Sequence, residues 1–300
     1  MTHQHPTGAE SLPGPGSVSW ERFGVTPGVF LAGTGLLLQV AHPVVGVGVR
    51  DHSEFRSRPW KRAWDTHLST LRFVYGMGGG ADAEGRRLVD VHRDIKGVDD
   101  AGRRYHALNP GAYAWVHLTL ARYLVDTADT FGPPMDADER ETMWAEFRAI
   151  GFALGLKSHH MAASWAEAEE IFDRTVRETL EANDSTADVL RALTHPARPT
   201  RALPEPLWRA AIRPAGRLVR FTTVGALPPV LRQRLGVRWT ARDERRFRRF
   251  ARAVGAVHRR LPEPLRYAPA AYGLILRGRA RERAAHRDTS RAADDGLRTA

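Results

Sequence analysis

Apolar residues recur along most of this chain at the three- and four-residue spacing that places them on one face of an α-helix. Two such segments contain histidines: Leu88, Val91, His92 and Ile95 in the first, and Tyr113, Val116, His117, Leu120 and Leu124 in the second. The spacing predicts that His92 and His117 each lie on an apolar, core-facing stripe of a helix. Alternating β-branched runs are scarce, so the pattern favours an all-α fold.

Polar residues in front of the apolar stripes predict where several helices begin. Asp136 is placed to cap a helix, and Ser164 with Glu167 forms a capping-box signature. A further amphipathic helix is expected to begin near Thr240.

One uncharged stretch of 23 residues, from Pro27 to Val49, meets the length expected of a transmembrane helix of about 20 apolar residues. It also contains five glycines and the pair His42-Pro43, and a proline inside a helix removes a hydrogen bond and bends or ends the helix. The sequence therefore favours a buried core helix broken at His42-Pro43. A membrane span, or membrane contact by this stretch, stays open as the alternative.

The ends of the chain differ in composition from its middle. Residues 1–19 are polar and rich in Pro, Gly and Ser, and they lack the basic start and short apolar block of a secretory signal. We therefore expect a disordered N-terminal tail on a cytoplasmic protein. A single helical domain is expected over residues 20–275, followed by a basic, flexible C-terminal tail over residues 276–300.

The net charge of +11 is concentrated in the last hundred residues, which hold 24 Arg and 8 acidic residues. This distribution predicts solvated basic helix faces first, and a peripheral contact with an anionic membrane surface or nucleic acid second. No zinc finger or recognition module with interleaved aromatic residues accompanies the charge. Specific nucleic-acid binding is therefore not expected.

Four histidines, His42, His52, His92 and His117, lie among apolar residues in the first 120 positions. A buried histidine most often hydrogen-bonds a carbonyl and stays neutral. The chain has no cysteine, and it lacks the Glu-x-x-His pairs of di-iron bundles and the His-Glu-x-x-His of zinc proteases. Neutral imidazole is then the remaining soft protein ligand for a porphyrin iron, so both a structural and a ligating role stay open for these residues.

Several short segments occur in a characteristic order: LLLQVAHP (36–43), DHSEF (51–55), Arg62-x-x-x-Thr66, VHRDIKG (91–97), WVHLTL (115–120), LPPVLRQRLGVRW (227–239) and LPEPLRYAP (261–269). Their order and spacing resemble the DUF2236 family, which is the catalytic-domain superfamily of the latex-clearing rubber oxygenases and the fungal oxygenase MpaB. The resemblance covers roughly residues 20 to 270.

The resemblance implies an α-helical, globin-like core with additional helices that holds a non-covalent haem b. By position, His92 looks like the proximal iron ligand of the rubber oxygenases. Arg62 and Thr66 look like the arginine and threonine that the family places near the haem, where a guanidinium would pair with a propionate. His117 and His42 also fit family positions, either on the distal side or as braces between helices.

One departure from the family concerns Asp65. Rubber oxygenases carry a lysine just before the threonine, and in this chain that position is Asp65. A carboxylate is a better ligand for hard cations than for haem iron. Asp65 therefore joins His117 and His42 as a candidate for a distal base that transfers protons.

The function implied by the resemblance is that of a haem-b-dependent oxygenase, which uses O2 to modify an unsaturated apolar substrate such as an isoprenoid. In such an enzyme the cofactor does the oxygen chemistry, while the protein sets ligation and substrate placement. The alternative is a non-catalytic haem-binding or haem-sensing protein, which the Asp65 departure favours. The sequence does not indicate the electron donor.

Overall fold

The computed structural model describes residues 11–56, 58–76, 79–200 and 202–298, and it confirms the predicted all-α class and a single helical domain. The α-helices of these ranges are α1 (Val18–Arg22), α2 (Ala32–Val40), α3 (Pro43–His52), α4 (Pro59–Tyr75), α5 (Gly79–Arg93), α6 (Pro110–Phe131), α7 (Ala137–Ala153), α8 (Trp165–Glu178), α9 (Asp184–Thr194), α10 (Glu205–Ala226), α11 (Pro229–Arg234), α12 (Ala241–Arg260), α13 (Glu263–Arg266) and α14 (Pro269–Arg298). Short 3-10 helices are η1 (Thr26–Phe30), η2 (Glu54–Arg56) and η3 (Ser158–His160).

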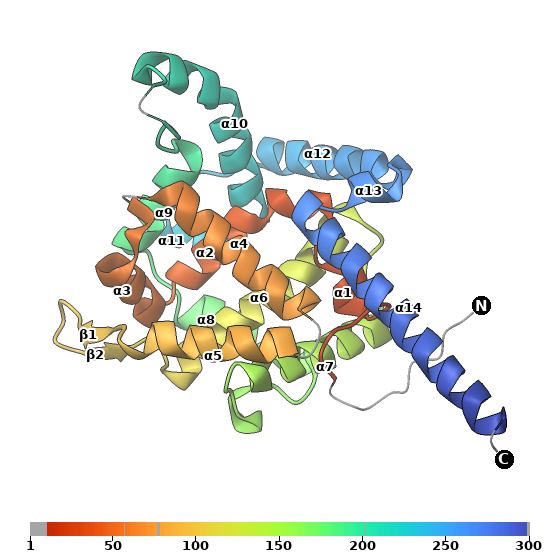
Figure 1. Ribbon diagram of the computed structural model, residues 1–300. Helices are drawn as coiled ribbons and strands as arrows, with labels where there is room; N and C mark the ends of the chain where they lie inside the picture. The colour runs from red at the N-terminus through yellow and green to blue at the C-terminus, as the bar shows by residue number, and fades with distance from the viewer. Residues whose placement is uncertain (1–10, 57, 77–78, 201, 299–300) are drawn as a thin grey trace.

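Helix α6 occupies the middle of the fold (Figure 1). Its start is defined by the side chain of Asn109, which accepts a hydrogen bond from the Ala112 amide, and by Pro110 in the first turn. It packs against α2, α7, α8 and α12. The side chains of Leu124 and Val125 are almost fully buried, so α6 forms the centre of the main hydrophobic core.

The uncharged stretch is broken at His42-Pro43, as the sequence favours, and its first half, α2, lies in the core, whereas in α3 only Gly46 is buried. Helix α2 ends at Val40, His42 precedes the first turn of α3, and Pro43 is the first residue of α3. The two helices meet at 99°, and Leu37 and Leu38 of α2 are buried in the core. Within the described ranges, no individual helix combines the length and the apolar character that crossing a bilayer requires, although this bent pair has them jointly.

The predicted helix starts are confirmed by capping contacts. Asp136 accepts from the Glu139 amide while the Glu139 side chain reaches back to the Asp136 amide, and Thr240 makes the same reciprocal pair with Asp243. Ser164 accepts from the Glu167 amide as expected.

Helices α4 and α5 pack against each other, and α5 leads into a small antiparallel hairpin (Figure 1). Its strands are β1 (Lys96–Val98) and β2 (Arg104–His106), with Gly97 opposite Tyr105. This end of α5 departs from the predicted stripe: Val91 is 52% exposed and Ile95 follows the end of the helix. The expectation that Val91 faces the core is therefore wrong, because the last turn of α5 lies at the edge of the molecule beside the hairpin.

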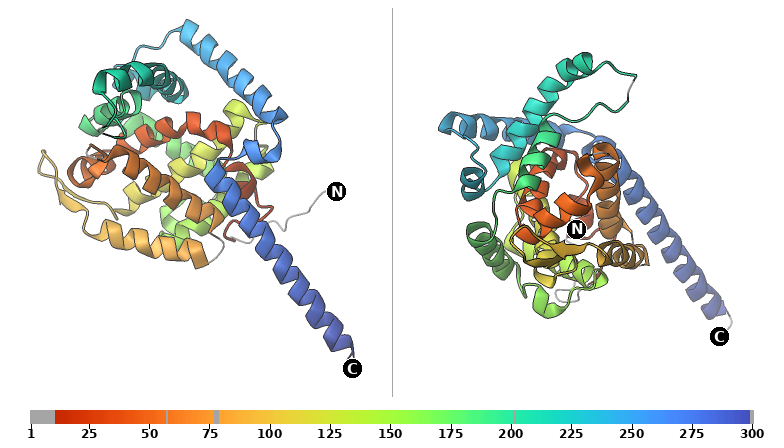
Figure 2. Two further views of the ribbon diagram at one scale, coloured as in Figure 1. Left: turned by 45° about the horizontal axis from the view of Figure 1, so that its top comes forward. Right: turned by 90° about the vertical axis from the view of Figure 1, so that its left-hand side faces the viewer.

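Two helices leave the body of the molecule. The first half of α10 rises at the top of Figure 1, and α14 extends away from the body in every view (Figures 1 and 2). Helix α14 continues to Arg298, through the segment for which the sequence predicts a flexible tail.

Candidate functional site

Helices α4 and α5 are joined at a buried carboxylate. Ser69 Oγ donates to Glu84 Oε1 at 2.6 Å, and Arg72 Nη1 and Arg87 Nε lie 3.3 and 2.9 Å from Glu84 Oε2. Burial alone would raise the pKa of Glu84, but hydrogen bonds from Arg87 and Ser69 hold that pKa at about 2. Glu84 is thus ionised, and it sets how α4 lies against α5.

His92 lies two turns further along α5 and is half-buried. Its Nδ1 is 2.7 Å from the carbonyl oxygen of Leu88, and its ring meets the ring of Tyr113 edge-on at 6.0 Å between centroids. Because a carbonyl can only accept, Nδ1 carries the proton and Nε2 keeps its lone pair. Burial lowers the pKa of His92, and the positive charges of Arg62 and Arg87 lower it further. The imidazole is therefore neutral near pH 7, which is the state that binds iron.

Arg62 and Thr66 form one unit on α4. Arg62 Nη1 donates to Thr66 Oγ1, and Thr66 Oγ1 donates to the Arg62 carbonyl oxygen at 2.9 Å. Within the described ranges Arg62 makes no ion pair with a carboxylate. The Arg62 side chain is exposed, but the protein around it removes part of its hydration, and this desolvation lowers its pKa. The charge of Arg62 lowers the pKa of His92, and the carboxylate of Asp65 acts on that charge in the opposite sense.

Asp65 is on the outside of α4. Its Oδ2 accepts from Lys61 Nζ at 2.6 Å, and the two side chains are 49% and 63% exposed. The hydrogen bond from Lys61 lowers the pKa of Asp65, so the carboxylate is charged and turned toward a solvated lysine. Among the described residues, neither Asp65 nor Lys61 contacts His92. A distal role for Asp65 stays a prediction.

His117 is enclosed in solid packing between α6 and α7. It is 2% exposed, and its ring lies 6.2 Å from that of Trp144 and 5.7 Å from that of Phe147. A Cβ added at Gly151 would come within 3.2 Å of His117 Nε2 and 2.3 Å of Met161 Sδ, so the absence of a side chain there makes room for the imidazole. Burial lowers the pKa of His117 to about 4, so the imidazole is neutral near pH 7, and its distal role stays a prediction.

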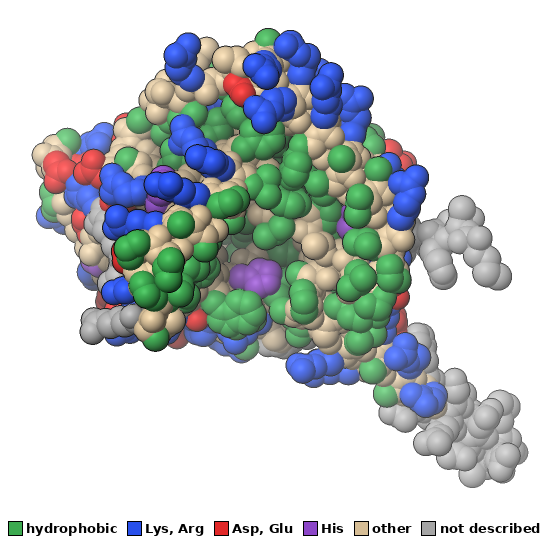
Figure 3. Space-filling model, turned by 90° about the horizontal axis from the view of Figure 1, so that it is seen from above, with side chains coloured by type: hydrophobic (Ala, Val, Ile, Leu, Met, Phe, Trp, Pro, Cys, Tyr) green, Lys and Arg blue, Asp and Glu red, His purple; other side chains and the backbone are tan. Residues whose placement is uncertain are grey.

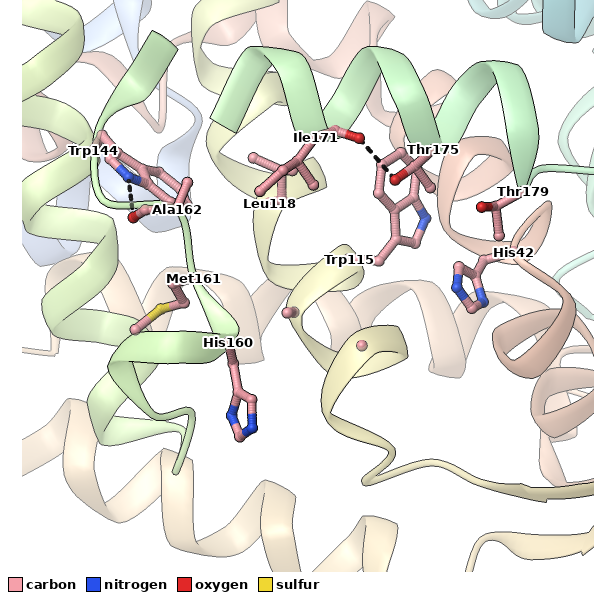
Figure 4. Close-up of a pocket in the computed structure, with 12 residues that line it drawn as sticks. His42, Trp115, Leu118, Trp144, His160, Met161, Ala162, Ile171, Thr175 and Thr179 are labelled. Carbon is pink, nitrogen blue, oxygen red and sulfur yellow. Dashed lines mark hydrogen bonds between the residues drawn. The ribbon is translucent and has the colours of Figure 1, made fainter. Parts of the chain in front are cut away.

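His42 lines a separate cavity of about 270 Å³, shown in Figure 4. Other residues around the cavity include Trp115, Leu118, His160 and Met161. Among the described residues, the buried Nδ1 of His42 has no hydrogen-bond partner, and burial lowers the pKa of this histidine.

Helix α6 stands between this cavity and His92. Ala114, Trp115 and Leu118 of α6 face the cavity, whereas Tyr113 packs against His92. Residues 113 and 115 are about 200° apart around a helix, so they point to opposite sides. The structure thus brings Arg62 into electrostatic range of His92, turns Asp65 toward Lys61, and places His42 on the opposite side of α6. His117 lies one turn beyond Tyr113 on the same face of α6.

Tyr113 is the residue that the sequence pattern misses at this site. Its hydroxyl is buried and has no hydrogen-bond partner within the described part of the chain, and burial raises its pKa to about 12. Its place on the same helical stripe as His117 is visible in the sequence, but its contact with His92 crosses from α6 to α5 and leaves no local signal.

The donor set near His92 suits a macrocyclic iron cofactor better than a bare metal ion. Across the described ranges, no group of three or more His, Asp or Glu side chains is arranged to hold a metal ion. A haem needs one neutral imidazole from the protein, and its propionates need cationic or hydroxyl partners. The Nε2 of His92, the guanidinium of Arg62 and the Tyr113 hydroxyl, which has no hydrogen-bond partner among the described residues, are groups of these kinds.

Comparisons with known proteins place the chain in a family. The family model described as "ER-bound oxygenase mpaB/B'/Rubber oxygenase, catalytic domain" matches residues 20–256. Two uncharacterized proteins, from Mycobacterium bovis and Mycobacterium tuberculosis, are each 28% identical over 225 residues, which is 73% of this chain and 84% of theirs. No solved structure matches. Because the family model spans most of the chain, this protein belongs to the family of mpaB and rubber oxygenase catalytic domains.

Proposed function

We propose that this protein is a haem-b-dependent oxygenase that uses O2 to modify an unsaturated apolar substrate such as an isoprenoid, with His92 as the axial ligand. Family membership supports the oxygenase class. The observation that carries the haem assignment is the state of His92: Nδ1 is anchored to the Leu88 carbonyl, Nε2 is free, and the pKa is lowered. A ring nitrogen held in this way orients the ligand and makes the opposite nitrogen a better electron donor.

The other residues near His92 have roles that follow from their chemistry. Arg62 supplies a positive charge for a propionate, and Thr66 holds the guanidinium in place through its hydroxyl. The Tyr113 ring limits rotation of the imidazole, and its hydroxyl is available to a polar edge of the cofactor. Haem b, when bound, supplies the activation of O2, while the chain contributes ligation, charge and exclusion of water.

The test is the absorption spectrum of the purified protein reconstituted with hemin. We expect a Soret band for the wild type and for His159→Ala, an exposed histidine on η3, and a shifted or lost band with weaker haem affinity for His92→Ala. If His92→Ala kept the wild-type spectrum and haem content, His92 would not be the ligand.

A second candidate function is haem binding or sensing without turnover. The ion pair of Asp65 with Lys61 favours it, because a carboxylate held by a solvated lysine is less available as a proton-transferring group. Oxygen uptake by the haem-loaded protein, with a short polyisoprene and a reductant present, separates the two functions. Substrate-dependent uptake supports the oxygenase, and its absence alongside a normal Soret band supports the sensor.

A further inference from the structure

Helix α10 carries an apolar stripe that faces solvent. Leu207, Ala211, Pro214 and Leu218 follow the spacing of one helix face, and all four are exposed, with Leu207 at 62% and Leu218 at 38%. The opposite side of the helix is the packed one, because a Cβ at Gly216 would lie 2.0 Å from the Thr194 carbonyl oxygen of α9. Within the described ranges, the stripe is left without a protein partner.

Two tryptophans of α4 extend this apolar surface. Trp60 is 47% and Trp64 is 56% exposed. The ring of Trp60 lies 6.5 Å from that of Trp208 on α10, and their indole N–H groups donate to the carbonyl oxygens of Ala197 and Pro196, both at 2.8 Å. These contacts hold the first turn of α10 next to the exposed rings of α4.

A row of arginines runs beside the apolar stripe of α10. Arg213, Arg217 and Arg220 are exposed, and none forms an ion pair among the residues that the structure describes. The acidic residue of this helix, Glu205, is already 2.8 Å from Arg209. The helix therefore presents apolar and cationic rows side by side, with the cationic row uncompensated.

The whole side of the molecule from which α10 rises has the same character. In Figure 3, hydrophobic side chains gather around a hollow in the middle of this face, and Lys and Arg side chains cluster along its upper and left edges. The chain carries a net charge of +11, so the surroundings reinforce attraction to anions.

We propose that α10, together with Trp60 and Trp64, docks this protein on a bilayer that contains anionic lipids. The apolar stripe would enter the boundary between headgroups and acyl chains, and the guanidinium groups would stay with the phosphates. A second copy of the chain fits less well, because a symmetric contact would bring two uncompensated arginine rows together. Nucleic acid would pair with the arginines but would leave the leucine stripe in water.

The test is co-sedimentation of the full-length protein with vesicles of phosphatidylcholine alone or mixed with phosphatidylglycerol, at low and at high salt. We expect the protein to pellet with the mixed vesicles, and less so at high salt. R213Q/R217Q should lower the partition coefficient by about fivefold for each arginine removed. L207S/L218S should lower it by about tenfold.

Matched controls remove the same chemistry elsewhere. R174Q/R177Q takes two exposed arginines from α8, and Val98→Ser takes an apolar side chain that is 58% exposed from β1. Both should pellet like the wild type. Circular dichroism confirms that every variant is folded.

Three results would overturn the proposal: no pelleting of the wild type with the mixed vesicles, equal losses in the α10 variants and the controls, or a dimer that L207S/L218S disrupts in a protein that does not bind vesicles. The measurement needs neither haem nor turnover. Its failure would leave the proposed oxygenase function standing, and failure of the Soret test would leave this surface standing.

Discussion

Replacing Glu84 with Gln tests whether the α4–α5 pair depends on one buried charge. The substitution keeps the size of the side chain and its capacity to bond Ser69, but it removes the charge that faces Arg72 and Arg87. We therefore expect E84Q to fold, to be less stable than the wild type, and to bind hemin more weakly because the helices that carry Arg62 and His92 lose their anchor.

The magnitude follows from the pKa. A lowering from 4.5 to about 2 corresponds to about 3.4 kcal/mol at 1.36 kcal/mol per unit. Glu84 itself is 4% exposed, but Arg72 and Arg87 are 52% and 48% exposed, so solvent screens part of the attraction. We expect a loss of about 2 kcal/mol in the free energy of unfolding near neutral pH.

The pH dependence has a definite sign. Because the pKa of Glu84 is lower in the folded state, its stabilisation is complete above pH 4.5 and disappears as the pH falls from 4.5 toward about 2. The difference between the wild type and E84Q should therefore shrink over that range.

Urea unfolding followed by circular dichroism measures this difference at about pH 7 and about pH 3. Asp90→Asn is the control, since Asp90 pairs with Arg93 on the same helix at 2.7 Å but both side chains are 65% exposed. That variant should change stability by no more than about 0.5 kcal/mol. Equal effects of E84Q and D90N, or a difference for E84Q that does not shrink in acid, would show that the charge of Glu84 does not stabilise the α4–α5 pair.

Three further predictions concern packing and charge. Gly85→Ala should lower the free energy of unfolding by about 2 kcal/mol or more, because the new Cβ would lie 2.1 Å from the Ala153 carbonyl oxygen. Gly80→Ala meets no described atom within 4 Å and should leave the stability unchanged or raise it. Equal shifts in Tm for the two variants would contradict this. Burial lowers the pKa of His117 to about 4, so as the pH falls the unfolded chain takes up a proton first, and the free energy of unfolding should decrease between pH 6.5 and 4. His117→Leu should flatten that part of the plot of unfolding free energy against pH, measured by urea unfolding. Arg62→Gln should raise the pKa of His92, observed by NMR titration of the hemin-free protein, and should weaken hemin binding; an unchanged pKa would show that the two charges do not interact.

Several features of the fold were predictable because they depend on residues close together in the chain. The break at His42-Pro43 follows from the missing amide of proline, and the cap at Asp136 follows from a carboxylate three residues before Glu139. The motif order likewise predicted the family, which the match over residues 20–256 confirms.

The candidate site was predictable only in part. His92, Arg62 and Thr66 were expected near one another, and the charge of Arg62 does act on His92. The spacing that placed His117 on an apolar stripe was equally correct, but it could not distinguish a core histidine from a ligand. The same limit applies to His42, which faces a cavity on the other side of α6.

By itself, the sequence determined the helices, their caps, the break in the apolar stretch and the family. Only the tertiary structure decided that Tyr113 meets His92 and that the apolar stripe of α10 stays in solvent. The physical reason is that helical spacing tells which side chains share a face, whereas the neighbour of that face is chosen by packing between segments that are distant in the chain.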